Sequence, residues 1–180
     1  ISPTTAGHVS RYFGGNLEVV LDGGECLKGI ESTIIGFEGE QAVLYRLGSI
    51  SAEDIERVVG KLKFHTIDDS APAAPGMLSR HYAPSTETLL TQDIKEMVLS
   101  HPNKKIGLLI FQENPISQHV AHTEVLSQKG DLNEAARNLY AAMHRLDHLD
   151  LDVIIAEKLP EEGLGKSIND RLKRAVKKQL

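Results

Sequence analysis

The sequence predicts an α/β protein whose C-terminal half is a Rossmann-like, three-layer α/β domain with a mostly parallel sheet. Two observations support this fold class. After residue 85, short apolar runs alternate with longer amphipathic segments, and before it a proline-rich stretch with little periodicity separates two ordinary patterns. Such alternation is typical of right-handed β-α-β crossovers, in which helices cover both faces of a parallel sheet. The proline-rich stretch is predicted to be a linker or a functional loop.

A helix is predicted at each end of the first half. Ser2 suits the start of a helix over residues 3–13, which a Gly-Gly pair ends. Ser51 suits the start of a second helix over residues 51–62, because Asp54 follows in the arrangement of a capping box. The residues predicted for the apolar face of this second helix are Ile55, Val58, Val59 and Leu62.

β-branched and apolar runs predict the strands. In the first half these runs lie at residues 17–24, 30–37 and 42–48. In the second half strands are predicted at residues 86–90, 104–111, 123–127 and 151–159, and helices at 93–101, 132–149 and 164–180.

Charge and composition exclude several classes of protein. The formal net charge of −5 and the pI near 5.9 argue against a protein that lives on the phosphate backbone of nucleic acid, so any RNA contact is expected to be weak and local. Cys26 is the only cysteine, which excludes an intrachain disulfide and a cysteine-based zinc cluster. No apolar run approaches the ~20 residues that span a bilayer. We therefore expect a cytoplasmic protein without a membrane partner.

Four motifs, in order, resemble one known family. The segments "SPTTAGHV", "LDGGECLKGIESTII", "LYRLGSIS" and "APGMLSRHYAP" are similar to the long, two-domain form of L-threonylcarbamoyladenylate synthase, the YrdC-like family. The resemblance covers essentially the whole chain. It implies a nucleotidyltransferase that makes threonylcarbamoyl-AMP from L-threonine, bicarbonate and ATP with Mg²⁺. A tRNA threonylcarbamoyl-transferase machinery would then use this product to modify an adenosine beside the anticodon.

The resemblance also implies a domain organisation. Residues 1–67 match the C-terminal part of the YrdC-like α/β catalytic domain, residues 68–85 a linker or lid, and residues 86–180 the C-terminal α/β domain. The larger N-terminal part of that catalytic domain has no counterpart in this sequence. We therefore predict that the chain alone is an inactive fragment of the enzyme.

Two polar side chains in the first half are predicted to contact substrates. Ser32 stands in an apolar run, where a hydroxyl faces either solvent or a partner, and the resemblance implies that it contacts threonine. Arg46 ends a run and precedes Gly48, which would let a ligand approach the backbone. An arginine there suits either a surface ion pair or bidentate phosphate binding, and the resemblance favours ATP.

The start of the first helix is a second predicted ATP contact. Thr4 lies where unpaired backbone N–H groups favour an anion, although helix capping by Ser2, Thr4 or Thr5 explains the same residue types. The resemblance implies that Thr4 touches ATP, with Ser2 as a weaker candidate. The chemistry needs positioned charges rather than a covalent nucleophile, so we assign no catalytic residue and no protein metal ligand.

The linker contains the remaining predicted ATP contacts. The resemblance implies that it folds over the site, where Arg80, His81 and Tyr82 would close on the nucleotide and exclude water from a labile carbamate intermediate. Tyr82 is the preferred contact among the three. A proline-stiffened spacer is the alternative interpretation of the same residues.

Other features are interpreted as structural. His119, His122, His144 and His148 lack a carboxylate motif of the zinc-hydrolase type, and the C-terminal cations are predicted to be a solvated helix end. Those cations are Arg171, Lys173, Arg174, Lys177 and Lys178. The alternative function for the whole chain is a non-catalytic α/β module that binds a nucleotide or RNA and regulates a partner.

Overall fold

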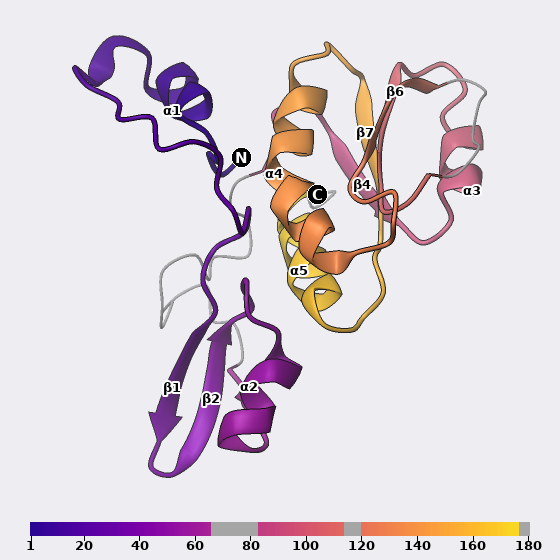
Figure 1. Cartoon of the computed structure of the whole chain (residues 1–180). Coiled ribbons are helices and arrows are strands. Elements are labelled where there is room, and N and C mark those ends of the chain that lie inside the picture. Colours follow the sequence, from indigo (N-terminus) through magenta and orange to yellow (C-terminus); the bar gives the residue numbers. More distant parts are fainter. Residues whose placement is uncertain (66–82, 114–119, 177–180) are drawn as a thin grey trace.

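The computed structural model describes residues 1–65, 83–113 and 120–176. Figure 1 shows an α/β unit formed by the C-terminal half and, beside it, a smaller N-terminal part that carries a β-hairpin at one end and a helix at the other. The described residues form two separate sheets, with strand orders β1-β2-β3 and β4-β7-β5-β6. Within the described ranges, no helix is long and apolar enough to cross a membrane.

The chain opens with helix α1 (Ala6–Phe13) and the 3₁₀ turn η1 (Gly14–Asn16). The predicted start at residue 3 is wrong, because Thr5 is the N-cap: its Oγ1 accepts a hydrogen bond from the His8 backbone N–H at 3.1 Å. The predicted end is confirmed. Gly14 caps the helix at a φ of 55°, a left-handed conformation that glycine adopts without steric cost.

The predicted strand over residues 17–24 is wrong. No strand forms between residues 17 and 33, and the side chains of Val19, Leu21 and Leu27 are 73%, 90% and 85% exposed. A strand requires neighbours for its backbone N–H and C=O groups, and within the described ranges this segment belongs to neither sheet. The strand predicted at residue 30 therefore starts later, at Ile34.

A small three-stranded sheet follows. Strand β1 (Ile34–Glu38) pairs antiparallel with β2 (Gln41–Arg46), and the two-residue strand β3 (Lys63–Phe64) pairs parallel with β2. β3 was not predicted, since two residues carry no periodicity. The small core beneath this sheet is formed by Ala42, Leu44, Ala52 and Leu62.

Helix α2 (Ala52–Val59) covers this sheet. Its predicted capping box is confirmed: Ser51 Oγ accepts from the Asp54 backbone N–H at 3.1 Å and donates to Asp54 Oδ2 at 2.6 Å. The prediction that Val58 lies on the apolar face is wrong, because Val58 is 84% exposed. The narrow sheet covers only the stripe of the helix that carries Ala52, Ile55 and Val59.

The C-terminal half forms a four-stranded sheet in which every neighbouring pair is parallel. Its strands are β4 (Thr88–Thr91), β5 (Ile106–Ile110), β6 (Val120–Val125) and β7 (Val153–Glu157). Its helices are α3 (Ile94–Leu99), α4 (Leu132–Asp147) and α5 (Leu164–Ala175). The predicted α/β fold class with a mostly parallel sheet is confirmed.

The sheet separates two hydrophobic cores and makes three layers. Along β7, Val153 and Ile155 face α3, whereas Ile154 and Ala156 face α4 and α5. Because successive strand residues point to opposite faces, a strand with helices on both sides must be apolar throughout. This requirement explains why apolar residues follow one another without a break along residues 153–156, instead of alternating with polar ones.

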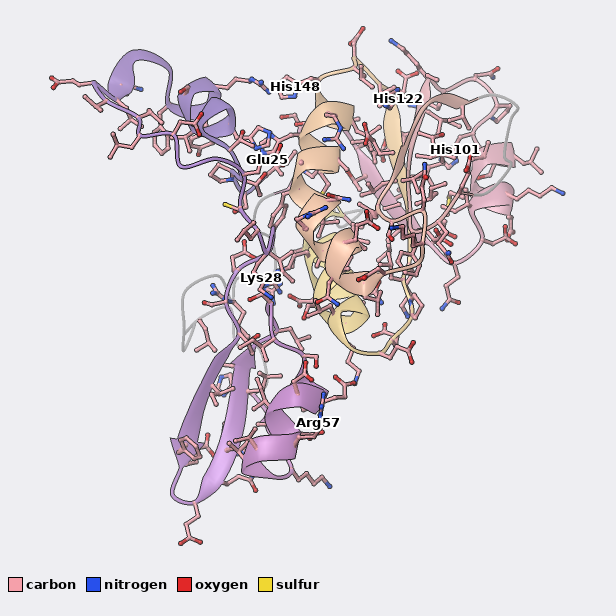
Figure 2. All side chains as sticks on the ribbon, in the orientation of Figure 1. Glu25, Lys28, Arg57, His101, His122 and His148 are labelled. Atoms are coloured by element: carbon pink, nitrogen blue, oxygen red, sulfur yellow. The ribbon has the colours of Figure 1, made fainter. Side chains whose placement is uncertain are left out.

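The N-terminal part is joined to the α/β unit along the segment before β1. Figures 1 and 2 show this segment, with Glu25 and Lys28, passing beside α4. Ile30 is buried in the core of α4 and α5. At Gly29, whose φ is 70°, an added Cβ would lie 2.3 Å from the Arg137 carbonyl oxygen, so only glycine permits this approach of the two backbones.

Candidate functional site

Ser32 and Arg46, the two substrate contacts predicted on neighbouring segments, meet in the structure. Ser32 lies just before β1, and Arg46 is the last residue of β2. The Arg46 guanidinium donates to the Ser32 carbonyl oxygen from Nε at 3.1 Å and from Nη2 at 3.0 Å. Nη2 also donates to Ser32 Oγ at 3.1 Å. A planar guanidinium held along one edge presents a fixed positive charge, which suits the recognition of an anion.

Gly48 has a different role from the predicted one. An added Cβ at Gly48 would lie 2.3 Å from both the Ser32 carbonyl carbon and the Thr33 backbone nitrogen, so this glycine admits another stretch of the chain rather than a ligand. Thr33 strengthens the contact. Its Oγ1 donates to the Ile50 carbonyl oxygen at 2.7 Å and accepts from the Ile50 N–H at 3.0 Å.

Thr4 and Ser2 lie at a second location, before α1. Thr4 is 6% exposed, and its backbone N–H donates to His8 Nδ1 at 3.2 Å while its Oγ1 lies 3.3 Å from the same nitrogen. The Ser2 carbonyl oxygen accepts from His144 Nε2 at 3.2 Å. Of the three capping candidates, Thr5 is the cap, so the Thr4 hydroxyl faces an imidazole rather than an open helix end.

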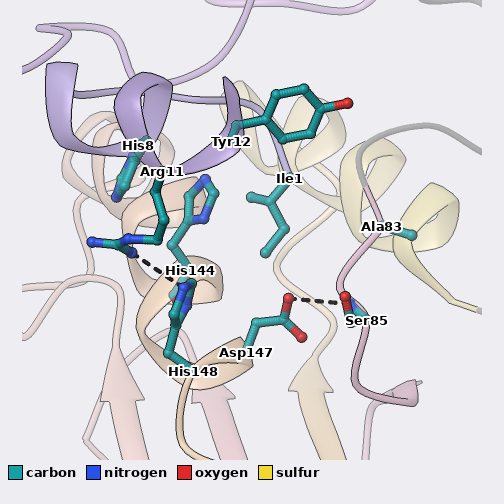
Figure 3. A pocket seen from close by; sticks show the side chains of 9 residues that line it. All are labelled: Ile1, His8, Arg11, Tyr12, Ala83, Ser85, His144, Asp147 and His148. Atoms are coloured by element: carbon teal, nitrogen blue, oxygen red, sulfur yellow. Dashed lines mark hydrogen bonds between the residues drawn. The ribbon is translucent and has the colours of Figure 1, made fainter. Parts of the chain in front are cut away.

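A cavity of about 400 Å³ lies beside this location (Figure 3). The rings of His8 and His144 stack with centroids 3.9 Å apart, which places α1 against α4. His148 Nδ1 donates to the His144 carbonyl oxygen at 2.6 Å, and Arg11 Nη1 donates to His148 Nε2 at 3.2 Å. A second cavity of about 430 Å³ shares these three histidines and Arg11.

Burial disfavours the charged form of both stacked rings. It lowers the pKa of His144 to about 4, with a further contribution from His8. It also lowers the pKa of His8, with Arg11 as the second cause. Within the described ranges, no group of three or more His, Cys, Asp or Glu side chains is arranged to hold a metal ion. The stacked pair escaped sequence analysis because His8 is far from α4 in sequence.

The predicted contacts therefore form two groups rather than one. Figure 1 shows α1 and the β1–β2 hairpin at opposite ends of the N-terminal part. Thr4 directly precedes Thr5, the N-cap of α1, and Ser32 lies two residues before the start of β1. The linker contacts Arg80, His81 and Tyr82 lie outside the described residues, as does His119.

Sequence analysis missed a buried charge network beside Ser32. Arg171 is 6% exposed, and its Nε donates to Glu31 Oε2 at 3.0 Å while Nη1 donates to Asp170 Oδ2 at 2.7 Å. The Tyr140 hydroxyl donates to Glu31 Oε1 at 3.0 Å. Burial, followed by the Glu31 charge, raises the pKa of Tyr140 above its usual value.

The prediction of a solvated, cationic C-terminal helix end is wrong for two of its residues. Arg171 pairs with Glu31 and Asp170, and Arg174 pairs with Asp170 at 3.0 Å. A signal for Arg171 existed in the sequence: it follows Ile168 by three residues, a spacing that places both on the same face of a helix.

Comparison with known proteins places the chain in a family. A family model described as the C-terminal domain of threonylcarbamoyl-AMP synthase matches residues 50–176. The chain is 37% identical to the threonylcarbamoyl-AMP synthase of Pyrococcus abyssi and 30% identical to that of Bacillus subtilis. Each match covers 97% of this chain, and 54% and 53% of the respective relative. The chain thus spans about half the length of the curated relatives that it matches.

Solved structures agree with these matches. The crystal structure of Pyrococcus abyssi Sua5 in complex with L-threonine superposes with a TM-score of 0.83 at 35% identity, over 97% of this chain and 54% of that one. A variant of the same archaeal protein, in which neighbouring histidine and tyrosine residues are replaced by alanine, gives a TM-score of 0.81 at 35% identity, over 97% of this chain and 53% of the other. The chain belongs to the threonylcarbamoyl-AMP synthase family.

Proposed function

We propose that this chain supplies the Ser32–Arg46 edge of a site that forms threonylcarbamoyl-AMP from L-threonine, bicarbonate and ATP. The observation that carries the proposal is the contact between the Ser32 hydroxyl and the Arg46 guanidinium, found in a chain of this family. A hydroxyl beside a fixed cation suits a site that binds an amino acid next to the phosphate chain of a nucleotide.

The reaction assigns a role to each member of this edge. The threonine nitrogen attacks the carbon of bicarbonate, and water leaves to give a carbamate. An oxygen of this carbamate then attacks the α-phosphorus of ATP, and the bond to the departing pyrophosphate breaks. Ser32 would orient threonine by a hydrogen bond. Arg46 would bind the phosphates of ATP and stabilise the negative charge that develops on them in the transition state. The relative solved with L-threonine supports the choice of amino acid. Thr4, with Ser2 beside it, would contact ATP from the α1 side.

The linker residues complete the proposed site. Arg80, His81 and Tyr82 would close over the nucleotide, and Tyr82 would be the ATP contact. His81 and Tyr82 form the one His-Tyr dipeptide in this sequence, and a neighbouring histidine and tyrosine were the residues replaced in the solved variant of the relative. Closure would keep water from the carbamate.

Mg²⁺ would be held mainly by the substrate. The described residues offer no group of three or more carboxylate, histidine or cysteine side chains for a metal. Mg²⁺ favours oxygen ligands and often binds through substrate phosphates. We therefore assign no protein ligand to it and no step that depends on one.

Activity is proposed for the complete site rather than for this segment. Because the chain spans about half of its relatives, the 180-residue chain by itself would be inactive. The product would pass to the tRNA threonylcarbamoyl-transferase machinery, with at most a weak RNA contact here. A cytoplasmic location without a membrane partner accords with this role.

The test is pyrophosphate release by the protein expressed from its complete reading frame. We expect release that requires both L-threonine and bicarbonate. Arg46→Ala should lower kcat/KM by about 100-fold, since it removes a charged donor from the site. Ser32→Ala should raise the KM for threonine. Arg57→Ala, on the exposed face of α2 (Figure 2), is the matched control and should have no effect.

Three outcomes would contradict parts of the proposal. Full activity of Arg46→Ala would remove this edge from the site. Turnover by the 180-residue chain alone would show that no further catalytic region is needed. ATP binding without turnover by the complete reading frame would favour a non-catalytic, nucleotide-binding module.

A further inference from the structure

We infer that helix α5 of the C-terminal α/β unit positions the Ser32–Arg46 contact, with Arg171 and Ser167 as positioning residues that act through Glu31 and Gly48. The inference rests on the proposed function for its effect on substrates, but its structural claim stands by itself. On this inference, the C-terminal unit contributes to the site by holding Ser32 and Arg46 in position.

Arg171 holds the residue next to Ser32. Its Nε donates to Glu31 Oε2 at 3.0 Å, and the Tyr140 hydroxyl of α4 donates to Glu31 Oε1 at 3.0 Å. The side chains of Arg171 and Glu31 are only 5% and 18% exposed. A buried charge without its partner is strongly disfavoured, so the Glu31 carboxylate cannot leave this position without a large cost.

The backbone around Glu31 is fixed as well. Ile30 is buried among α4 and α5, and Gly29 touches the α4 backbone. The Glu31 carbonyl oxygen accepts from the Ser49 N–H at 2.9 Å, which ties this segment to the turn after β2. Because Ser32 follows directly, its carbonyl oxygen and hydroxyl are set by the same anchor.

The same helix also holds the other side of the contact. Ser167 is fully buried, and its Oγ donates to the Gly48 carbonyl oxygen at 2.8 Å. One turn away from Arg171, α5 therefore holds the chain that follows Arg46. Lys166 adds an ion pair to Glu53 of α2 at 2.5 Å. A displacement of α5 would move both partners of the Ser32–Arg46 contact.

The structural test is amide hydrogen exchange at Ser49 and Ile50, whose N–H groups donate to Glu31 and Thr33. We expect Glu31→Gln and Arg171→Lys to lower protection at these two amides by about tenfold, since each disrupts a buried, charged hydrogen bond. The matched control is Glu124→Gln, which weakens the Arg145–Glu124 pair inside the α/β unit and should leave both amides protected.

A milder variant, Ser167→Ala, tests the inference even if the charge substitutions unfold the protein. Ser167→Ala removes only the hydroxyl that donates to Gly48, and it should lower Ser49 protection while the amides of β5 keep theirs. Unchanged protection of Ser49 and Ile50 in Ser167→Ala and in every folded variant of Glu31 and Arg171 would overturn the inference.

Steady-state kinetics on the complete reading frame separates this inference from the proposed function. We expect the positioning variants to raise the KM for L-threonine more than they lower kcat, whereas Glu124→Gln should change neither. Lost protection with an unchanged KM would uphold the positioning by α5 and reject Ser32 as the threonine contact. Unchanged protection with a raised KM would reject the positioning.

Discussion

At the scale of single residues, the Ser32–Arg46 contact depends on a position that has no side chain. The backbone of Ser32 and Thr33 packs directly on Gly48, where even a methyl group would overlap. The charged residues nearby are as specific: Arg171 is paired on one side with Glu31 and on the other with Asp170. Gly48 and Arg171 contact no substrate in the proposed site, yet both determine where Ser32 lies.

Gly48→Ala is expected to destabilise the protein. The added Cβ would lie 2.3 Å from two backbone atoms, which cannot rotate away, so we expect the free energy of unfolding to fall by about 1–3 kcal/mol. Urea unfolding followed by circular dichroism measures this loss. Gly23→Ala is the matched control, because nothing lies within 4 Å of its Cβ, and its effect should be about 0.5 kcal/mol or less. Equal stability of the two variants would contradict the close approach at Gly48.

At the scale of elements, α1 is held to α4 by a pair of histidines. No residue of α1 is buried, and the helix contacts α4 through the stack of His8 on His144 and through the hydrogen bond from Arg11 to His148. His144 also donates to the Ser2 carbonyl oxygen just before α1. Burial opposes the charged form of both rings. The association of the two helices should therefore depend on pH.

We expect acid to weaken this association. The pKa of His144 is lowered from 6.5 to about 4, so the unfolded chain binds the proton more readily than the folded one. The contribution of neutral His144 is complete above pH 6.5 and is lost as the pH falls toward about 4. Urea midpoints at several pH values should fall with acid more steeply for the wild type than for His144→Phe, which keeps a stacked ring but cannot take up a proton.

The control for this comparison is His101→Phe. His101 follows α3 on the opposite side of the sheet from α4 (Figure 2). Its replacement therefore leaves the rings of His8 and His144 in place. The urea midpoints of His101→Phe should change with pH as those of the wild type do. A His144→Phe profile identical to the wild-type profile would show that the stack does not contribute to the acid dependence.

At the scale of the whole molecule, the two parts differ in how well they bury apolar side chains. The α/β unit encloses two cores, whereas the N-terminal part leaves large apolar residues exposed between α1 and β1. Val19, Leu21 and Leu27 are the clearest cases. All three lie on the segment between η1 and β1, where water reaches most of each side chain.

We expect the 180-residue chain to bind a hydrophobic fluorescent dye through this segment. The triple variant Val19→Ser, Leu21→Ser, Leu27→Ser should bind less dye than the wild type, with a free energy of unfolding within about 0.5 kcal/mol, because these side chains are largely exposed. Leu99→Ser, at a residue of α3 that is 65% exposed, is the control and should leave dye binding nearly unchanged. Equal dye binding by the triple variant and the wild type would contradict the assignment.

Sequence reasoning reached the C-terminal fold because its signals are local. A predicted element overlaps each described helix and strand of the α/β unit, since apolar periodicity and capping act over neighbouring residues. Two bounds were wrong: β6, predicted over residues 123–127, begins earlier, at Val120, and α5, predicted to reach residue 180, ends at Ala175. The strand over residues 17–24 failed because pairing needs a partner that the run itself does not specify. The short β3 was not predicted, because its two residues carry no pattern of their own and become a strand only by pairing with β2.

By itself, then, the sequence determined the fold class, the N-cap of α2 and the residue types proposed for a substrate site. The tertiary structure alone decided which residues distant in sequence meet: Arg46 with Ser32, His8 with His144, and Arg171 with Glu31. The physical reason is the range of the interactions. Helix caps and periodicity join residues a few positions apart, whereas Glu31 and Arg171 come together only when α5 packs beside the segment that precedes β1.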